Sequence, residues 1–165
     1  MVRKILKAKN ILELESIHVC TGKSVTNQIY LHLLGEQPRI PWKCMMFGNA
    51  GRPKARFTLW LQMQNILLTS DRLNRWGMEV ESKCNLCHQA EESGDHLYVK
   101  CDYMKAVMNK LMQWSHSQNI DIDTGDWEQH VQEVIRRAKG KLREAQLFKM
   151  LYTETVYCLW IERNK

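Results

Sequence analysis

The stretch CNLCHQAEESGDHLYVKC, residues 84–101, contains three of the six cysteines and two of the six histidines of the 165-residue chain. Its cysteines and its second histidine follow the pattern Cys-x2-Cys-x8-His-x4-Cys. Two residues between Cys84 and Cys87 suffice for a tight turn that points both thiolates at one tetrahedral zinc ion, and Cys101 can supply a third sulfur. The spacing therefore predicts a metal-binding knuckle, with an incidental Cys-x2-Cys pair in a metal-free protein as the alternative.

The fourth ligand is expected to be His96, with His88 and Asp95 as competing donors. His88 directly follows Cys87 and would have to fold back to reach the same ion, whereas the Gly94-Asp95 turn brings the chain back toward it. Three thiolates and one imidazole fill a tetrahedral shell and leave no position for water. We therefore predict one structural zinc ion and no catalytic metal.

The chain on both sides of the knuckle has the periodicity of α-helices. A helix is expected from Ser24 to Gly35, and a short one over residues 71–76 with Leu73 and Trp76 facing inward. Only short strand candidates occur, around residues 83–89. A helix that begins at Pro53 has one largely apolar face, formed by Phe57, Trp60, Leu61, Gln64 and Leu68. A helix capped by Asp102 aligns Tyr103, Val107, Leu111 and Trp114.

Two more helices near the C-terminus are predicted to form an antiparallel pair interrupted at Gly140. The first aligns Trp127, Val131, Val134, Ile135 and Ala138. The second aligns Ala145, Phe148, Tyr152, Thr155 and Leu159. The fold class is thus mainly α: a small irregular helical domain with a Cys-x2-Cys zinc knuckle, followed by a C-terminal helical pair. The predicted segments are a basic extension (residues 1–23), the zinc-binding domain (24–116) and the helical hairpin (117–165).

The charge of the chain favours a polyanionic partner. Its formal net charge is +6 and its pI is about 9.0, and residues 37–70 contain five Lys or Arg and no acid. Such a surface attracts phosphates, and Trp42 or Trp76 could stack on bases. Solvated basic residues around tryptophans that serve as core anchors, among them Trp60, Trp76 and Trp127, are the alternative. The predicted nucleic-acid contacts are Lys43, Arg52, Lys54, Arg56, Arg72, Arg75 and Lys83.

Composition limits the compartment. No apolar run approaches the ~20 residues of a membrane span, and a zinc knuckle of thiolates suits a reducing compartment. We expect an intracellular protein of the nucleus or cytoplasm. An organelle is the alternative, because the first twelve residues are basic and contain no acid. The remaining cysteines have apolar neighbours and are expected in the core: Cys20, Cys44 and Cys158.

An ordered series of short motifs resembles the zinc-binding domain that follows the polymerase region in plant LINE-type (non-LTR) retrotransposon reverse transcriptases. The series is IPWK (residues 40–43), RPKARF (52–57) running into LWL (59–61), LTSDRL (68–73), WG (76–77), CNLC (84–87), EES (91–93) and HLYVKC (96–101). VYCLWIERN (156–164) looks like the segment that follows this domain in the same elements. The chain is thus similar to a stand-alone or domesticated fragment of such a polymerase.

The resemblance implies that the metal ligands are Cys84, Cys87, His96 and Cys101. It also implies that the domain helps a retroelement polymerase hold its RNA template or target DNA. The chain contains no polymerase Tyr-x-Asp-Asp motif, and no endonuclease or ribonuclease H carboxylate cluster can be assembled from it. We therefore expect a non-catalytic, zinc-stabilised protein that binds RNA in preference to DNA, and neither a membrane nor a small-molecule substrate. The alternative is a structural or adaptor subunit that contacts protein subunits of a larger ribonucleoprotein assembly.

Overall fold

The computed structural model describes residues 24, 30, 34–35, 40–114, 125–140 and 142–165. The chain divides into two compact units, residues 1–40 and residues 41–165. The helix predicted from Ser24 to Gly35 lies largely outside the described residues. The domain boundaries inferred from the sequence stay a prediction.

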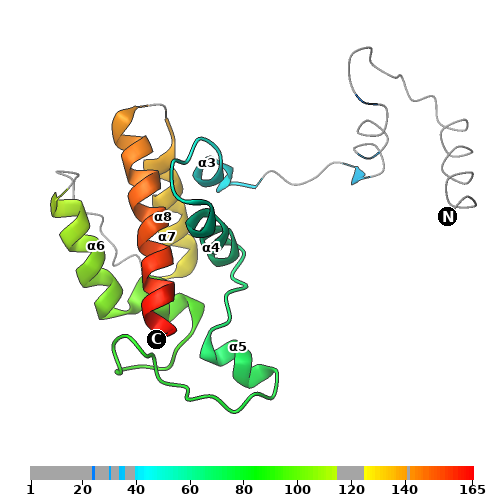
Figure 1. Cartoon of the computed structure of the whole chain (residues 1–165), viewed down its shortest axis with the longest axis vertical. Helices are drawn as coiled ribbons and strands as arrows, with labels where there is room; N and C mark the ends of the chain where they lie inside the picture. The colour runs from blue at the N-terminus through cyan, green and yellow to red at the C-terminus, as the bar shows by residue number, and fades with distance from the viewer. Residues whose placement is uncertain (1–23, 25–29, 31–33, 36–39, 115–124, 141) are drawn as a thin grey trace, which may run out of the picture. The chain divides into compact units, whose positions relative to one another are not determined.

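The second unit is a bundle of helices, which confirms the mainly helical fold class. Among the described residues it contains no strand, only an isolated antiparallel bridge between Lys83 and Glu91 where a short strand was expected. Long helix α8 contacts α4, α6 and α7, while α6 and α4 flank it in Figure 1. The elements are α3 (Lys43–Met46), α4 (Pro53–Met63), α5 (Ser70–Arg75), π-helical turn η1 (His96–Lys100), α6 (Asp102–Trp114), α7 (Trp127–Ala138) and α8 (Arg143–Arg163).

The C-terminal pair of helices forms as predicted. The Asp126 carboxylate caps α7 by accepting a hydrogen bond from the Gln129 N–H at 2.8 Å, and Gly140 separates the helices with a φ of +119°. Such a backbone angle suits glycine, which has no Cβ to clash. All five residues predicted to align on the second helix are buried in α8. No helix among the described residues is long and apolar enough to span a membrane.

Most of the apolar face predicted for α4 does not pack into the core, although Leu61 is partly buried against it. Phe57 and Trp60 are 60% and 39% exposed, and Gln64 and Leu68 are also exposed. The side that packs inward instead consists of Ala55, Thr58, Leu59, Gln62 and Met63. Both sides of this helix carry large apolar residues, so periodicity alone could not decide between them.

A buried polar network explains the orientation of α4. The Gln62 Nε2 donates a hydrogen bond to the Tyr152 hydroxyl at 3.1 Å, and His130 Nε2 lies 2.9 Å from the same oxygen. Burial lowers the pKa of His130 to about 4, so its imidazole is neutral at physiological pH. The network joins α4, α7 and α8, and it selects the side of α4 that carries Gln62 for the interior.

The inward side of α6 also differs from the expected one. Met104 and Met108 are fully buried, whereas Tyr103 and Trp114 are 42% and 72% exposed. Trp76, predicted to face inward from the short helix, is 62% exposed. Of the isolated cysteines, Cys44 is half-buried and Cys158 is exposed on α8. Cys20 lies outside the described residues.

Candidate metal centre

The knuckle at Cys84 is held by backbone hydrogen bonds. The Cys84 N–H donates to the Ala90 carbonyl at 2.9 Å, and the His88 N–H donates back to the Cys84 carbonyl at 2.9 Å. His88 has a φ of +56°, a left-handed conformation that tightens the turn. These contacts fold residues 84–90 into a compact loop that carries both cysteines of the Cys-x2-Cys pair.

The η1 turn positions the other two side chains. The Cys101 N–H donates a hydrogen bond to the His96 carbonyl at 2.7 Å, which is the i to i+5 pattern of a π-helical turn. The Ser93 hydroxyl accepts from the His96 N–H at 3.0 Å and fixes the start of the turn. His96 and Cys101 therefore stand at the two ends of one turn, next to the knuckle.

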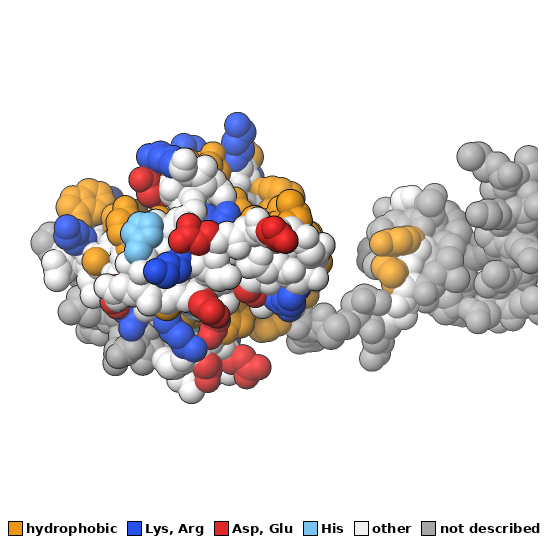
Figure 2. All heavy atoms as spheres, turned by 90° about the horizontal axis from the view of Figure 1, so that it is seen from below, with side chains coloured by type: hydrophobic (Ala, Val, Ile, Leu, Met, Phe, Trp, Pro, Cys, Tyr) orange, Lys and Arg blue, Asp and Glu red, His pale blue; other side chains and the backbone are white. Residues whose placement is uncertain are grey.

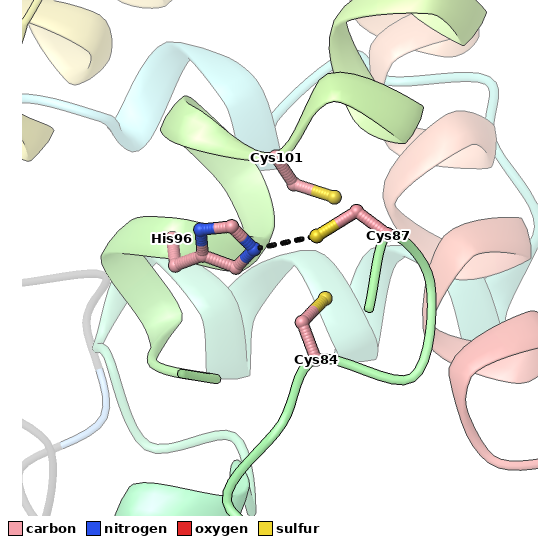
Figure 3. Close-up of side chains that lie close together, drawn as sticks. All are labelled: Cys84, Cys87, His96 and Cys101. Carbon is pink, nitrogen blue, oxygen red and sulfur yellow. Dashed lines mark hydrogen bonds between the residues drawn. The ribbon is translucent and has the colours of Figure 1, made fainter. Parts of the chain in front are cut away.

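The structure brings together the four side chains predicted as ligands. One ligand atom from each of Cys84, Cys87, His96 and Cys101 lies within 4.8 Å of all the others, and Figure 3 shows their sulfur and nitrogen atoms pointing toward one another. The Cys87 Sγ and His96 Nε2 are 3.2 Å apart. A tetrahedral zinc with bonds of ~2.3 Å places its sulfur ligands about 3.8 Å from each other, so the cluster has the dimensions of such a site.

Electrostatics favour a cation at this cluster. Burial raises the pKa of Cys84 and raises that of Cys101 to about 12, so neither thiol would ionise there without a nearby positive charge. Burial also acts to raise the pKa of Cys87, but backbone N–H groups and the neighbouring thiols outweigh it and lower this pKa. Metal ions bind the deprotonated thiolate, and a zinc ion supplies the missing charge.

The same pattern of backbone donors serves each sulfur. Cys84 accepts from the N–H groups two and three residues further along the chain, and so do Cys87 and Cys101. Hydrogen bonds to the charged form stabilise a thiolate, as the outer-shell partners of metal ligands commonly do. The local backbone therefore favours the thiolate form of each cysteine, although burial outweighs this effect at Cys84 and Cys101.

The two competing donors stay outside the cluster. His88 is exposed, and Asp95 forms an ion pair with the Lys100 Nζ at 2.9 Å. The ligand set that the geometry supports is the one with His96.

Comparison with known proteins assigns the chain to a family. A family model described as zinc-binding in reverse transcriptase matches residues 25–107, half of the chain and the whole of the cysteine-rich stretch. The chain belongs to this family of reverse-transcriptase zinc-binding domains. No curated protein and no solved structure matches the chain.

The reverse-transcriptase zinc-binding domain and its Cys3His cluster together fit a single structural zinc ion. Four protein donors of this kind complete a tetrahedral shell, so the metal would hold the fold and have no open position for a reactant. Cys84 and Cys101 are fully buried in the same hydrophobic core as α4, α6 and α8. The family and the site fit a zinc-binding protein derived from a retroelement.

Glu92 is a structural residue that the sequence did not reveal. Acidic residues are rarely fully buried, but the Glu92 side chain is, and its Oε1 lies 2.5 Å from the Arg163 Nη2 on α8. Its Oε1 also accepts a hydrogen bond from the Ser70 N–H at 2.8 Å. Burial alone would raise the pKa of Glu92, but the hydrogen bonds from Arg163 and Ser70 outweigh it and hold this pKa below its ordinary value.

The Glu92–Arg163 pair ties the metal loop to the last turn of α8. The Arg163 carbonyl accepts a hydrogen bond from the Asn85 amide at 3.3 Å, so a second contact joins the knuckle to the same residue. The Arg163 guanidinium also packs over the Trp160 ring at 5.2 Å. The zinc-binding segment is therefore in direct contact with the C-terminal helix, although the family match ends before α7 and α8.

The seven predicted nucleic-acid contacts lie on the surface, but they are not equivalent. Arg52 is bound by Glu154 at 2.6 Å, and Arg75 pairs with Asp71 at 2.8 Å, so part of their charge is neutralised. Arg72 donates a hydrogen bond to the Asn65 carbonyl and lies over Trp76. Four of the seven are exposed and form no ion pair with a described residue: Lys43, Lys54, Arg56 and Lys83.

The basic residues do not all collect in one place. Figure 2 shows a face on which Lys and Arg side chains are interspersed with Asp and Glu side chains. That face carries no uniform basic patch. Of the seven predicted contacts, the four with uncompensated charge lie in the acid-free segment of residues 37–70 or next to the knuckle.

Proposed function

We propose that this protein is a non-catalytic, zinc-stabilised module that binds single-stranded nucleic acid, with RNA preferred to DNA. The observation that carries the proposal is the surface exposure of Lys43, Lys54 and Arg56 in an acid-free segment of a reverse-transcriptase zinc-binding domain. Cations displayed on a rigid domain attract phosphates and release counterions from the nucleic acid. Zinc would fix the shape of the surface and take no part in a reaction.

An origin in plant LINE-type retrotransposons, an intracellular location and the absence of catalysis belong to the same proposal. The motif series around the knuckle supports the origin. Thiolate ligands suit a reducing compartment, and a closed ligand shell offers no site for chemistry. The protein would therefore act by holding nucleic acid in place for other components.

Binding to an unstructured RNA oligonucleotide is expected to weaken steeply as salt is raised. If the four uncompensated cations Lys43, Lys54, Arg56 and Lys83 each contact one phosphate, the slope of log K against log salt is about −3, from ~0.7 per phosphate for single strands. Fluorescence anisotropy with the zinc-loaded full chain measures this slope. Affinity without salt dependence, or no binding, would remove the proposal.

Matched charge variants show which surface of the protein produces the salt dependence of binding. The double variant Lys54→Gln and Arg56→Gln should reduce the slope by about 1.4, because two phosphate contacts are lost. Lys110→Gln removes one positive charge from the exposed side of α6 and should leave the slope nearly unchanged. An equal effect of the α6 variant would mean that net charge, and no particular surface, determines the affinity.

A groove between α6 and α8 favours a second candidate function, that of an adaptor subunit in a larger ribonucleoprotein assembly. It has a volume of about 350 Å³ and a mostly apolar lining, which is typical of surfaces that receive a partner. Size-exclusion chromatography of the native protein decides this: elution as a free monomer would count against it. The lining residues are Tyr103, Val107, Leu111, Leu151, Glu154, Thr155, Cys158, Leu159 and Glu162.

A further inference from the structure

Two aromatic rings stand exposed side by side on α4. The ring centroids of Phe57 and Trp60 are 5.9 Å apart and the ring planes differ by 21°, so the rings are stacked. Their side chains are 60% and 39% exposed, although they are among the most apolar residues of the helix. A preformed pair of this kind leaves a flat apolar surface in contact with water, and such surfaces commonly receive a ligand.

A cation lies one helical turn before each ring. Lys54 precedes Phe57 by three residues and Arg56 precedes Trp60 by four, and side chains at these separations are neighbours on a helix surface. Both cations are exposed, and neither forms an ion pair with a described residue. We call these four residues the α4 platform.

The polar surroundings of the α4 platform complement a polyanion. No acidic residue occurs in residues 37–70, which include the whole of α4. The Glu154 carboxylate of α8 binds the Arg52 guanidinium, just before α4, with contacts at 2.8 and 2.6 Å. The platform therefore offers apolar ring faces together with positive charge.

Two neighbouring segments repeat the combination of ring and cation. The Lys43 Nζ lies 5.3 Å from the centroid of the Phe47 ring, and the Arg72 guanidinium lies 5.9 Å from that of Trp76. Phe47 and Trp76 are 67% and 62% exposed. Exposed aromatic rings beside cations thus recur from α3 to the end of α5, the part of the chain that lies on the opposite side of α8 from α6 in Figure 1.

We propose that the α4 platform is a base-stacking site for single-stranded nucleic acid, an inference that rests on the proposed function and assigns it a place. Every base presents a π-face that can stack on Phe57 or Trp60, while Lys54 and Arg56 contact the adjoining phosphates. In a duplex the bases stack on each other and their faces are hidden, so the site selects single strands. Since all bases have such faces, it reads little sequence.

The test compares affinities for a labelled polyuridine oligonucleotide, using the zinc-loaded full chain. The double variant Phe57→Leu and Trp60→Leu keeps apolar side chains at exposed helix positions but removes both rings. It should weaken binding by about 5- to 150-fold for each base that loses its stack. The slope against salt should stay unchanged, because no charge is removed. Trp114→Leu, which removes a more exposed tryptophan from the end of α6, should have no effect.

The outcomes separate this inference from the proposed function. Wild-type binding that survives in the double variant overturns the α4 platform and leaves nucleic-acid binding intact. Equal affinity for a duplex of the same length also overturns it, and no wild-type binding overturns both. If circular dichroism shows that the double variant is unfolded, Trp60→Leu and Trp60→Phe decide, since only loss of the ring should weaken binding.

Discussion

Removal of the metal is expected to lower the melting temperature of the protein by roughly 10 °C or more. Cys84 and Cys101 are fully buried in the core, so chelation leaves thiols in positions where the backbone favours thiolates. Structural zinc contributes ~10–16 kcal/mol of apparent free energy in small peptides. Here the packing of α4, α7 and α8 also stabilises the fold, so the loss should be smaller than in a peptide. A loss of only ~3–5 kcal/mol already lowers the melting temperature by about 10 °C.

The loss of structure should begin around the knuckle. Hydrogen exchange of the chelated protein should increase first in residues 84–108, which contain the loop, η1 and the start of α6, and later in α8. Cys84→Ser should reproduce the effect, whereas Cys158→Ser, at an exposed cysteine outside the cluster, should not. A chelated protein that melts at the temperature of the zinc-loaded form would show that the metal does not hold the fold.

Breaking the Glu92–Arg163 pair is expected to cost about 3–5 kcal/mol of the free energy of unfolding, the range found when one partner of a buried ion pair is removed. Glu92→Gln leaves the Arg163 guanidinium without its counter-charge, and the Arg163 side chain is only 10% exposed. It also weakens the acceptor for the Ser70 N–H at the start of α5. Urea denaturation of the zinc-loaded chain measures the change.

Two comparisons make this prediction specific. Glu91→Gln changes the exposed neighbour in the same loop and should have little effect. Combining Glu92→Gln with Arg163→Met should restore part of the lost stability, because the uncompensated charge disappears with its partner. If Glu92→Gln costs no more than Glu91→Gln, the pair does not join the metal loop to α8.

The features that the sequence predicted are local in the chain. The knuckle depends on the spacing of Cys84 and Cys87, which two intervening residues bring to one point. The buried side of α8 was also predictable, because Phe148, Tyr152 and Leu159 repeat at helical spacing on one face. The start of α4 at Pro53 follows from the preference of proline for the first turn.

The features that the sequence missed depend on contacts between distant residues. The orientation of α4 is selected by a hydrogen bond between Gln62 and Tyr152, 90 positions apart. Glu92 is buried because Arg163, 71 positions later, neutralises it. Neither partner can be inferred from a single sequence, since an isolated acid and an isolated glutamine both resemble surface residues.

The exposure of the Phe57 and Trp60 rings could not be predicted for the same reason, because it depends on a contact between distant residues. An apolar stripe at helical spacing usually indicates a core face, and two stripes on one helix compete for that role. The polar network assigned the interior to the side with Gln62, which left the aromatic side outward. The two rings therefore lie on the surface, at the site to which we assign nucleic-acid binding.

The absorption spectrum of the cobalt-substituted protein tests whether Cys84, Cys87, His96 and Cys101 hold one structural metal ion. We expect one tetrahedral cobalt per chain with strong thiolate-to-metal bands. His96→Asn should weaken affinity by at least about 10–100-fold, the loss typical of even outer-shell partners, and His88→Asn should not. A five- or six-coordinate spectrum, or sensitivity to His88 and not to His96, would contradict this ligand set.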